Sequence, residues 1–338
     1  MTWQEVLINS RKFTAPKCAA CPVCNGRTCS NNIPGPGAKG YGDTAMRNFD
    51  AWQEIRLNMD TICENVEPDT SLELFGKKFK YPIFAGPVGA VKAHYCDKYD
   101  DKTYSEILVR SCAAAGIAAF TGDGLYPEVM KNACDVIRDN GGLGVPTVKP
   151  WDAATLHEKF EMVRKSDAFA AAMDIDAAGL PFLKGRTPPA GSKTVAELRD
   201  IIRDAGVPFI VKGVMTVKGA EKAIEAGASS ILVSNHGGRV LDGCAATAHV
   251  LPEIADAVNG RVKILVDGGI RTGTDIFRAI ALGANGVVIA RPFVTAVYGG
   301  EDEGVRVLTE KLGGELYDAM QMCGAKTLSD ISRDMVRY

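Results

Sequence analysis

Short apolar runs alternate with longer amphipathic segments along most of the chain. From about residue 81 onward there are eight such runs, at 81–87, 116–122, 142–149, 168–176, 208–213, 229–235, 262–269 and 286–292. Between them, apolar residues recur at spacings of three and four, which is typical of amphipathic helices, as in 103–116, 217–228 and 273–284. Several helical segments close on a glycine in the capping position: Gly116, Gly206, Gly227 and Gly283. The pattern predicts eight units of one strand and one helix.

The repeat length and the character of the runs indicate how these units assemble. A repeat of roughly 25 to 38 residues fits one β-strand with its helix, and near-continuous apolar strands are those buried on both faces. A doubly wound open sheet is the competing architecture, but the segment at the end of the first run, "FAGPVGA", does not fit its G-x-G-x-x-G fingerprint. The sequence therefore predicts an α/β fold, a (β/α)8 TIM barrel over residues 76–338. Residues 1–75 are expected to form an N-terminal arm and helical lead-in.

Composition narrows the classes of partner. The chain has 338 residues, is 46% hydrophobic and 24% charged, and has a formal net charge of −2. This near-neutral charge gives no electrostatic reason to expect nucleic acid or a membrane surface as a partner. The beginning of the chain, "MTWQEVLINSRKFTAPK", lacks the apolar core of a signal peptide, and no apolar run reaches the about 18 residues of a membrane span. We therefore expect a cytoplasmic protein.

Polar residues follow the apolar runs at the points where the strands should end. In a barrel, the carboxyl-terminal ends of the strands share one rim, and reactive groups collect there. We expect the following residues to share that rim: Thr121, Asp123, Thr147, Lys149, Asp174, Asp176, Lys212, Asn235, His236, Asp267, Arg271 and Arg291. For Asp123, Asn235 and Thr274, capping a helix or satisfying backbone groups is an equally good explanation. His236 and Arg239 lie three residues apart behind a buried strand, and for them a catalytic or binding role is favoured over a purely structural one.

Four of the ten cysteines fall within "CAACPVCNGRTC", at Cys18, Cys21, Cys24 and Cys29. A disulfide framework is not expected in a large chain with a core of its own. The spacing C-x2-C-x2-C-x4-C is close to the ferredoxin run, although its proline follows the second cysteine. Thiolates at this spacing can ligate an iron–sulfur cluster or a tetrahedral zinc ion. Free or redox-sensing thiols are the third alternative.

Four segments resemble one enzyme family. "IVKGV", "VSNHGGRVLDG", "VDGGIRTGTDIFRAIALGANGVVIARPF" and "GAKTLSDIS" are similar to segments of the FMN-dependent 2-hydroxy acid dehydrogenases and oxidases, which include glycolate oxidase, lactate oxidase and flavocytochrome b2. The similarity extends from about residue 40 to the C-terminus and is most specific from 208 onward. The resemblance implies a divergent bacterial-type member that oxidises a 2-hydroxy acid to the 2-oxo acid. It also implies a homo-oligomer.

The resemblance, supported by physical chemistry, suggests where FMN binds. The glycines of "DGGIRTG" let backbone N–H groups approach an anion and Arg271 adds a positive fork, as in phosphate sites behind strands seven and eight of barrels. Ala290 stands where the family usually has glycine, but backbone donation survives that change. The full set of implied FMN contacts is Ala85, Thr121, Thr147, Lys212, Ser234, Asp267 for the ribityl chain, and Gly268, Gly269, Arg271, Ala290 and Arg291 around the phosphate.

The catalytic roles implied by the resemblance also agree with the side-chain chemistry. His236 would act as the general base while hydride passes to flavin N5. Asp176 would pair with this histidine and stabilise its protonated form. Arg239 would bind the substrate carboxylate through its planar fork. Lys212 would place a positive charge where the flavin becomes negative.

The sequence departs from the family around the substrate. The loop 177–194 contains no securely aligned second arginine, and Lys184 and Arg186 are the candidates to replace it. One usual tyrosine position corresponds to Lys149, and the other falls within 31–40. A pocket that contains an ammonium in place of hydroxyl groups should prefer a substrate other than the simplest hydroxy acids.

Two other function classes stay open from the sequence. A type 2 isopentenyl diphosphate isomerase is a related FMN barrel without net oxidation, although it is not expected to retain His236 and Arg239. A non-catalytic flavin or redox sensor could use the cysteines. For the oxidoreductase, an iron–sulfur cluster would offer a one-electron exit route to a redox partner protein and favour a dehydrogenase. A zinc ion would only stabilise the structure of the N-terminal arm.

Overall fold

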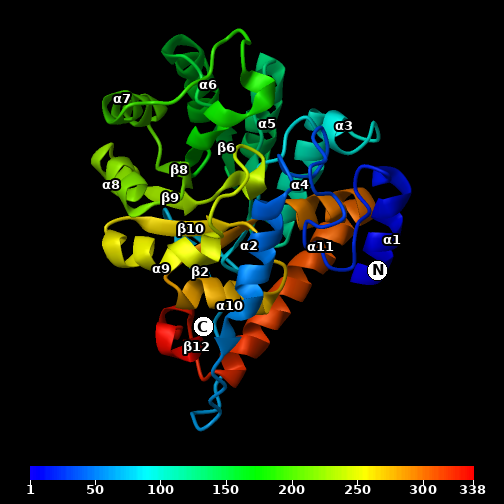
Figure 1. The fold of residues 1–338 in the computed structure, drawn as a ribbon, viewed down its shortest axis with the longest axis vertical. Coiled ribbons are helices and arrows are strands. Elements are labelled where there is room, and N and C mark those ends of the chain that lie inside the picture. The colour runs from blue at the N-terminus through cyan, green and yellow to red at the C-terminus, as the bar shows by residue number, and fades with distance from the viewer.

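A computed structural model describes all residues, 1–338, and its centre is a closed barrel of eight parallel strands (Figure 1). The strands succeed one another around the barrel in chain order, and the last, β11, pairs with the first, β4. Each overlaps one of the eight predicted runs, so the predicted (β/α)8 TIM barrel is confirmed. The strands are β4 (Ile83–Ala85), β5 (Ala118–Thr121), β6 (Gly144–Val148), β7 (Ala171–Asp174), β8 (Phe209–Val214), β9 (Ser230–Val233), β10 (Lys263–Asp267) and β11 (Gly286–Ile289).

Helices surround the barrel, and several end where the sequence predicts. Gly206 is the C-cap of α7 with φ +68°, and Gly116, Gly227 and Gly283 directly follow the C-caps of α4, α8 and α10, also with positive φ. Glycine adopts this left-handed conformation at little cost because it has no Cβ. The helices are α3 (Val91–His94), α4 (Asp101–Ala114), α5 (Pro127–Asp139), α6 (Ala153–Lys165), α7 (Val195–Ala205), α8 (Val217–Glu225), α9 (Thr247–Val258), α10 (Gly273–Ala281) and α11 (Arg291–Met322).

The amino-terminal segment closes one end of the barrel and flanks the other. The hairpin β2 (Leu72–Leu74) and β3 (Lys77–Phe79) buries Leu74 and Phe79 in one cluster with Phe84 and other side chains inside the barrel. The predicted division between residues 75 and 76 falls in the turn of this hairpin, so residues on both sides of it contribute to the barrel core.

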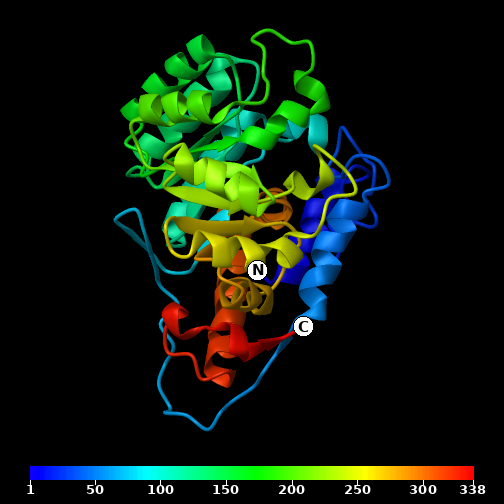
Figure 2. The same cartoon turned by 60° about the vertical axis from the view of Figure 1, so that its left-hand side comes forward.

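Two helices precede the hairpin, α1 (Trp3–Thr14) and α2 (Asp43–Glu54). The segment between them lies against the loops that follow β7 and β9, where Lys39 Nζ donates to the carbonyls of Gly179 and Val240 at 2.7 and 2.6 Å (Figure 2). This contact places the amino-terminal segment at the carboxyl-terminal rim of the barrel. At the other end of the chain, β12 (Val336–Arg337) pairs with β1 (Arg56–Leu57).

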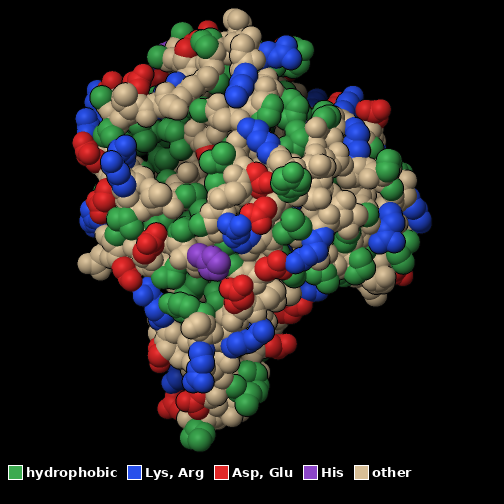
Figure 3. Space-filling view, in the orientation of Figure 1, with side chains coloured by type: hydrophobic (Ala, Val, Ile, Leu, Met, Phe, Trp, Pro, Cys, Tyr) green, Lys and Arg blue, Asp and Glu red, His purple; other side chains and the backbone are tan.

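The surface fits the near-neutral composition. Acidic and basic side chains are interspersed over the face seen in Figure 3, without a large area of one sign. None of the helices combines the length and the apolar character needed to cross a bilayer.

Candidate active site

A cavity of about 470 Å³ opens at the carboxyl-terminal ends of the barrel strands. Its volume is within the range of small-molecule and cofactor sites. Its wall brings together residues from Gly35 to Arg291. The predicted residues that line it are Asp123, Lys149, Arg186, Lys212, His236, Arg239, Asp267, Gly268, Gly269, Arg271, Ala290 and Arg291.

Other predicted residues lie near the cavity but outside its wall. Ala85 and Thr121 are buried at the ends of β4 and β5, and Thr147 is buried in β6. Ser234 is buried behind Lys212 and accepts a hydrogen bond from its Nζ at 3.0 Å. Asp176 stands behind His236. These residues lie directly behind or beside the residues of the wall.

Two predicted rim residues have structural partners. Asp123 accepts hydrogen bonds from Trp151 Nε1 and Lys159 Nζ, both at 2.7 Å, and Asn235 exchanges hydrogen bonds with Asn48 of α2. Their polar groups are thereby satisfied within the protein. For both, the structural explanation that the sequence left open is supported.

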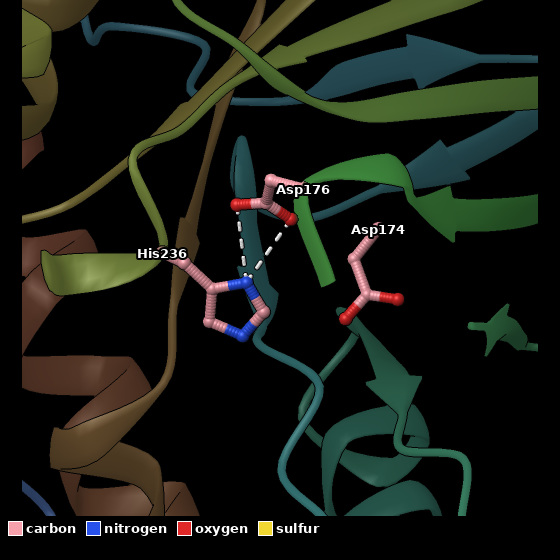
Figure 4. A group of neighbouring side chains, drawn as sticks. All are labelled: Asp174, Asp176 and His236. Atoms are coloured by element: carbon pink, nitrogen blue, oxygen red, sulfur yellow. Dashed lines mark hydrogen bonds and ion pairs between the residues drawn. The ribbon is translucent and has the colours of Figure 1, made fainter. Parts of the chain in front are cut away.

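His236 and Asp176 form the central pair of the site (Figure 4). Nδ1 of His236 lies 3.1 Å from each carboxylate oxygen of Asp176, whereas its Nε2 makes no hydrogen bond within the protein. Burial opposes ionisation of Asp176, but His236 and Lys212 outweigh burial and lower the pKa of its carboxyl to about 2. Asp176 is therefore an anion at neutral pH and holds the imidazole from one side.

The loop that carries His236 has an unusual backbone. His236 has φ +54°, a left-handed conformation that is costly for a residue with a side chain, and Gly237 and Gly238 follow with φ +60° and +76°. Strained backbone of this kind persists where the surrounding structure fixes it, and it often marks functional sites. The two glycines allow the turn to continue directly after His236.

Lys212 is a buried cation fixed by a bulge in β8. Its side chain is 3% exposed and its Nζ lies 3.7 Å from Asp267 Oδ2. Burial opposes its charge, but Asp176 and Asp267 raise the pKa of its ammonium. At Gly213, which has φ +104°, an added Cβ would lie 2.7 Å from the Asp176 side chain. Glycine there lets Lys212 and Asp176 approach each other.

The loop after β10 packs closely against α2, and the N–H groups that follow it have partners within the protein. Gly268 and Gly269 have φ +89° and +84°, and a Cβ on Gly269 would lie 2.2 Å from the backbone oxygen of Asn48. Asp275 occupies the N–H groups of Arg271 and Thr272 at the start of α10. The start of α10 is therefore already capped by the protein itself.

Hydrogen-bond donors without a partner in the protein are found at the start of α11. Ala290, its N-cap residue, has no side-chain cap, and Arg291 Nη1 is buried without a hydrogen-bond partner. Asp267 Oδ1 and Thr121 Oγ1 are also buried and unpartnered. An uncapped helix N-terminus beside an arginine nitrogen without a partner favours binding of a phosphate. The unpartnered oxygens of Asp267 and Thr121 can form hydrogen bonds with hydroxyl or N–H groups of a cofactor. The residues present therefore fit FMN.

Ala290, the departure from the usual glycine, fits because Gly86 faces it. A Cβ added to Gly86 would lie 2.9 Å from the Ala290 Cβ. The methyl group of Ala290 thus takes the space that a side chain at residue 86 would need.

Arg239 is held by the amino-terminal segment. Its Nη1 donates to the carbonyls of Gly35 and Gly37 at 2.8 and 2.7 Å, and its Nη2 lies 3.3 Å from a ring nitrogen of His94. Burial and the charge of Arg239 lower the pKa of His94 to about 4, so its ring is neutral. Sequence reasoning did not identify His94, because no motif surrounds it and only the position of α3 brings it to the cavity.

Lys149 lines the cavity but already has a carboxylate partner. Its Nζ lies 2.5 Å from Asp174 Oδ2, and the two side chains are 14% and 1% exposed. In the loop after β7, Arg186 lines the cavity and Lys184 does not. Arg186 is therefore the better placed of the two candidates for a second arginine.

Replacing Lys149 with methionine should lower the free energy of unfolding by about 3 kcal/mol, because Asp174 would keep a buried charge without a partner. Chemical denaturation measures this change. The double replacement Lys149→Met and Asp174→Asn should restore most of the loss. An unchanged unfolding free energy in the single variant would show that the pair is not stabilising the fold.

The cysteines of the amino-terminal segment are half-buried and unpaired. Burial raises the pKa of the Cys18 thiol to about 11, whereas at Cys24 the nearby Arg271 and Arg291 outweigh burial and lower it. No three of the four sulfur atoms lie within 4.8 Å of one another. Asp174, Asp176 and His236 do form such a group, but their carboxylates face the cations Lys149 and Lys212.

Comparison with known proteins agrees with this geometry. The family model for FMN-dependent dehydrogenases matches residues 36–181 and 146–338. An L-lactate oxidase of Lactobacillus jensenii is 31% identical over 317 residues, which covers 87% of this chain and 78% of that protein. A peroxisomal (S)-2-hydroxy-acid oxidase of Oryza sativa subsp. japonica is 42% identical over 326 residues, which covers 87% of both chains.

Solved structures show the same fold. A mandelate oxidase variant superimposes with a TM-score of 0.81 at 22% identity, over 99% of this chain and 97% of the other. A lactate oxidase of Pediococcus acidilactici gives 0.80 at 25% identity, over 100% and 95%. Fold and sequence thus confirm the predicted resemblance: the chain belongs to the FMN-dependent 2-hydroxy acid dehydrogenases and oxidases.

Proposed function

We propose that this site oxidises a 2-hydroxy acid to the 2-oxo acid. The observation that carries the proposal is the imidazole of His236, which has one nitrogen held by Asp176 and the other free in a cavity wall that also contains Arg239. FMN, when bound, supplies the acceptor for the hydride that leaves the substrate carbon. The protein supplies the base, the substrate anchor and the charges around them.

His236 is the base in this proposal. Because Asp176 accepts a hydrogen bond at Nδ1, that nitrogen carries the proton of the neutral ring and Nε2 carries the lone pair. Nε2 takes a proton from the substrate, and the ionised Asp176 stabilises the imidazolium that results.

Arg239 and Lys149 bind the substrate in this proposal. The carbonyls of Gly35 and Gly37 fix the plane of the Arg239 guanidinium, which suits recognition of a planar carboxylate. Lys149 contributes an ammonium to the same wall, and this favours a substrate with a further polar group.

Positions for the cofactor combine the unpartnered groups at the start of α11 with the contacts that the family resemblance implies. We assign the phosphate to Arg271, Arg291, Ala290 and the Gly268–Gly269 backbone. Asp267 is assigned to the ribityl chain, and Lys212 provides a fixed positive charge where negative charge develops. The remaining contacts are assigned to Ala85, Thr121, Thr147 and Ser234.

The relatives named above are oxidases, and the chain retains both His236 and Arg239, so neither the isomerase nor the sensor is favoured. A cytoplasmic location, a homo-oligomer and a redox partner protein are proposals that rest on the sequence and the family resemblance.

Anaerobic reduction of the purified protein by a panel of 2-hydroxy acids tests the function. We expect the protein to contain FMN, its absorbance to bleach with at least one 2-hydroxy acid, and the matching 2-oxo acid to form in equal amount. FAD in place of FMN would contradict the cofactor assignment. Turnover of isopentenyl diphosphate, with no bleaching by any hydroxy acid, would support the isomerase.

A further inference from the structure

The four clustered cysteines lie in a segment that the protein itself holds in place, here called the cysteine arm (residues 15–42). Arg11 of α1 donates to the carbonyls of Ala19 and Ala20 at 2.7 and 3.1 Å. At the other end of the cluster, Arg27 contacts both carboxylate oxygens of Asp50 on α2, at 2.9 and 2.7 Å. The backbone that carries the cysteines is thus fixed between α1 and α2.

The cysteine arm covers the arginine end of the cavity, defined by Arg271 and Arg291. Arg271 Nε donates to the carbonyl of Cys24 at 2.6 Å. Arg271 and Arg291 both line the cavity. The backbone of Cys24 therefore contacts a cationic side chain of the cavity wall.

We infer that Cys18, Cys21, Cys24 and Cys29 are the ligands of an iron–sulfur cluster at the arginine end of the cavity. This site goes beyond the substrate oxidation proposed above, and it can fail without affecting that proposal. A cluster with four thiolate ligands is anionic, and the positive charges of Arg271 and Arg291 stabilise an anion beside them.

The positions of the sulfur atoms do not match the geometry of a single tetrahedral ion. Four thiolates around one zinc ion, each about 2.3 Å from the metal, lie about 3.8 Å from one another. No three of these sulfur atoms lie within 4.8 Å of one another. In a cubane cluster each cysteine binds a different iron, so the sulfur atoms stay farther apart.

The location of the cysteine arm next to the cavity also suits an electron-transfer cluster. Cys18 packs against the hydrophobic core, and the carbonyl of Cys24 accepts a hydrogen bond from Arg271, which lines the cavity. The arm therefore connects the protein core with a side chain of the cofactor site. A cluster exchanges one electron at a time, and here it would do so directly beside the cavity. The barrel and the cavity wall are complete without these four side chains.

Metal and sulfide analysis of the full chain, purified without oxygen, tests the site. We expect iron and acid-labile sulfide in similar amounts, and a low-temperature electron paramagnetic resonance signal after reduction with dithionite. If the cluster is lost on purification, incubation with ferrous iron and sulfide should restore all three. The double variant Cys21→Ala and Cys24→Ala should lose iron, sulfide and signal.

A matched control uses two cysteines outside the arm, Cys63 and Cys244, which are exposed and half-exposed. The double variant Cys63→Ala and Cys244→Ala should keep the full iron content. Circular dichroism shows whether each variant is folded, and an unfolded arm variant would be replaced by the single variant Cys21→Ala. Stoichiometric zinc, absence of iron after reconstitution, or iron that persists in the folded arm variant would overturn the assignment.

Discussion

Replacing His236 with alanine should slow anaerobic reduction of the bound FMN by a 2-hydroxy acid about 100-fold or more. The reason is that His236 presents an unbonded Nε2 to the cavity while Asp176 holds Nδ1 at 3.1 Å. A positioned base contributes about 10²- to 10⁴-fold to a proton transfer. Stopped-flow absorbance at saturating substrate measures the reduction rate directly.

The control for this variant is His249→Ala. His249 lies in α9, is half-exposed, and contacts only Glu54 at 3.4 Å, so its loss should leave the rate unchanged. The FMN content of both variants should match the parent, since neither side chain is assigned to the cofactor phosphate. Equal reduction rates in the His236 variant and the parent would remove this residue from the catalytic role.

The second large effect is expected at Arg239. Arg239→Lys should raise the KM for the 2-hydroxy acid by about 10- to 100-fold, because hydrogen bonds to a charged group contribute about 1.5 to 3 kcal/mol and an ammonium cannot reproduce the fork. The maximal reduction rate should fall less than in the His236 variant. Steady-state kinetics with an artificial electron acceptor, over a range of substrate concentrations, separate the two parameters.

Arg333→Lys is the matched control, since Arg333 pairs with Asp256 on the exposed surface at 2.9 Å. It should leave KM unchanged. A fall in the maximal rate of Arg239→Lys without a change in KM would indicate that Arg239 positions other residues and does not anchor the substrate. Loss of its contacts with Gly35 and Gly37 would then be the explanation to pursue.

The barrel and much of the cavity wall could be predicted from the sequence because both follow from short-range patterns. A near-continuous apolar run predicts a buried strand, and glycine after an amphipathic segment predicts a helix end, as at Gly206. Once eight such units close into a barrel, the residues behind the strands must meet at one rim, which placed His236, Arg239 and Arg271 together.

The partner of Asp174 was decided by the tertiary structure, whereas the family resemblance already implied the pair of Asp176 and His236. Asp174 and Asp176 are separated by one residue, so the strand pattern alone treats them alike. In the fold, Asp174 at the end of β7 meets Lys149, the residue after β6, and Asp176 beyond the strand meets His236. The bulge at Gly213 leaves the space in which Asp176 sits. Only the packed strands determine such neighbours.

The sequence by itself determined the eight strand and helix units, the family, and the polar residues behind the strands that line the cavity, such as Lys212, His236 and Arg239. The tertiary structure decided that His94 and the cysteine arm reach the site, and that Gly35 and Gly37 hold Arg239 from more than 200 residues away. The physical reason is that periodicity and glycine preferences act over a few residues along the chain. Contacts between distant segments depend on how their complementary surfaces pack, and no local pattern encodes that.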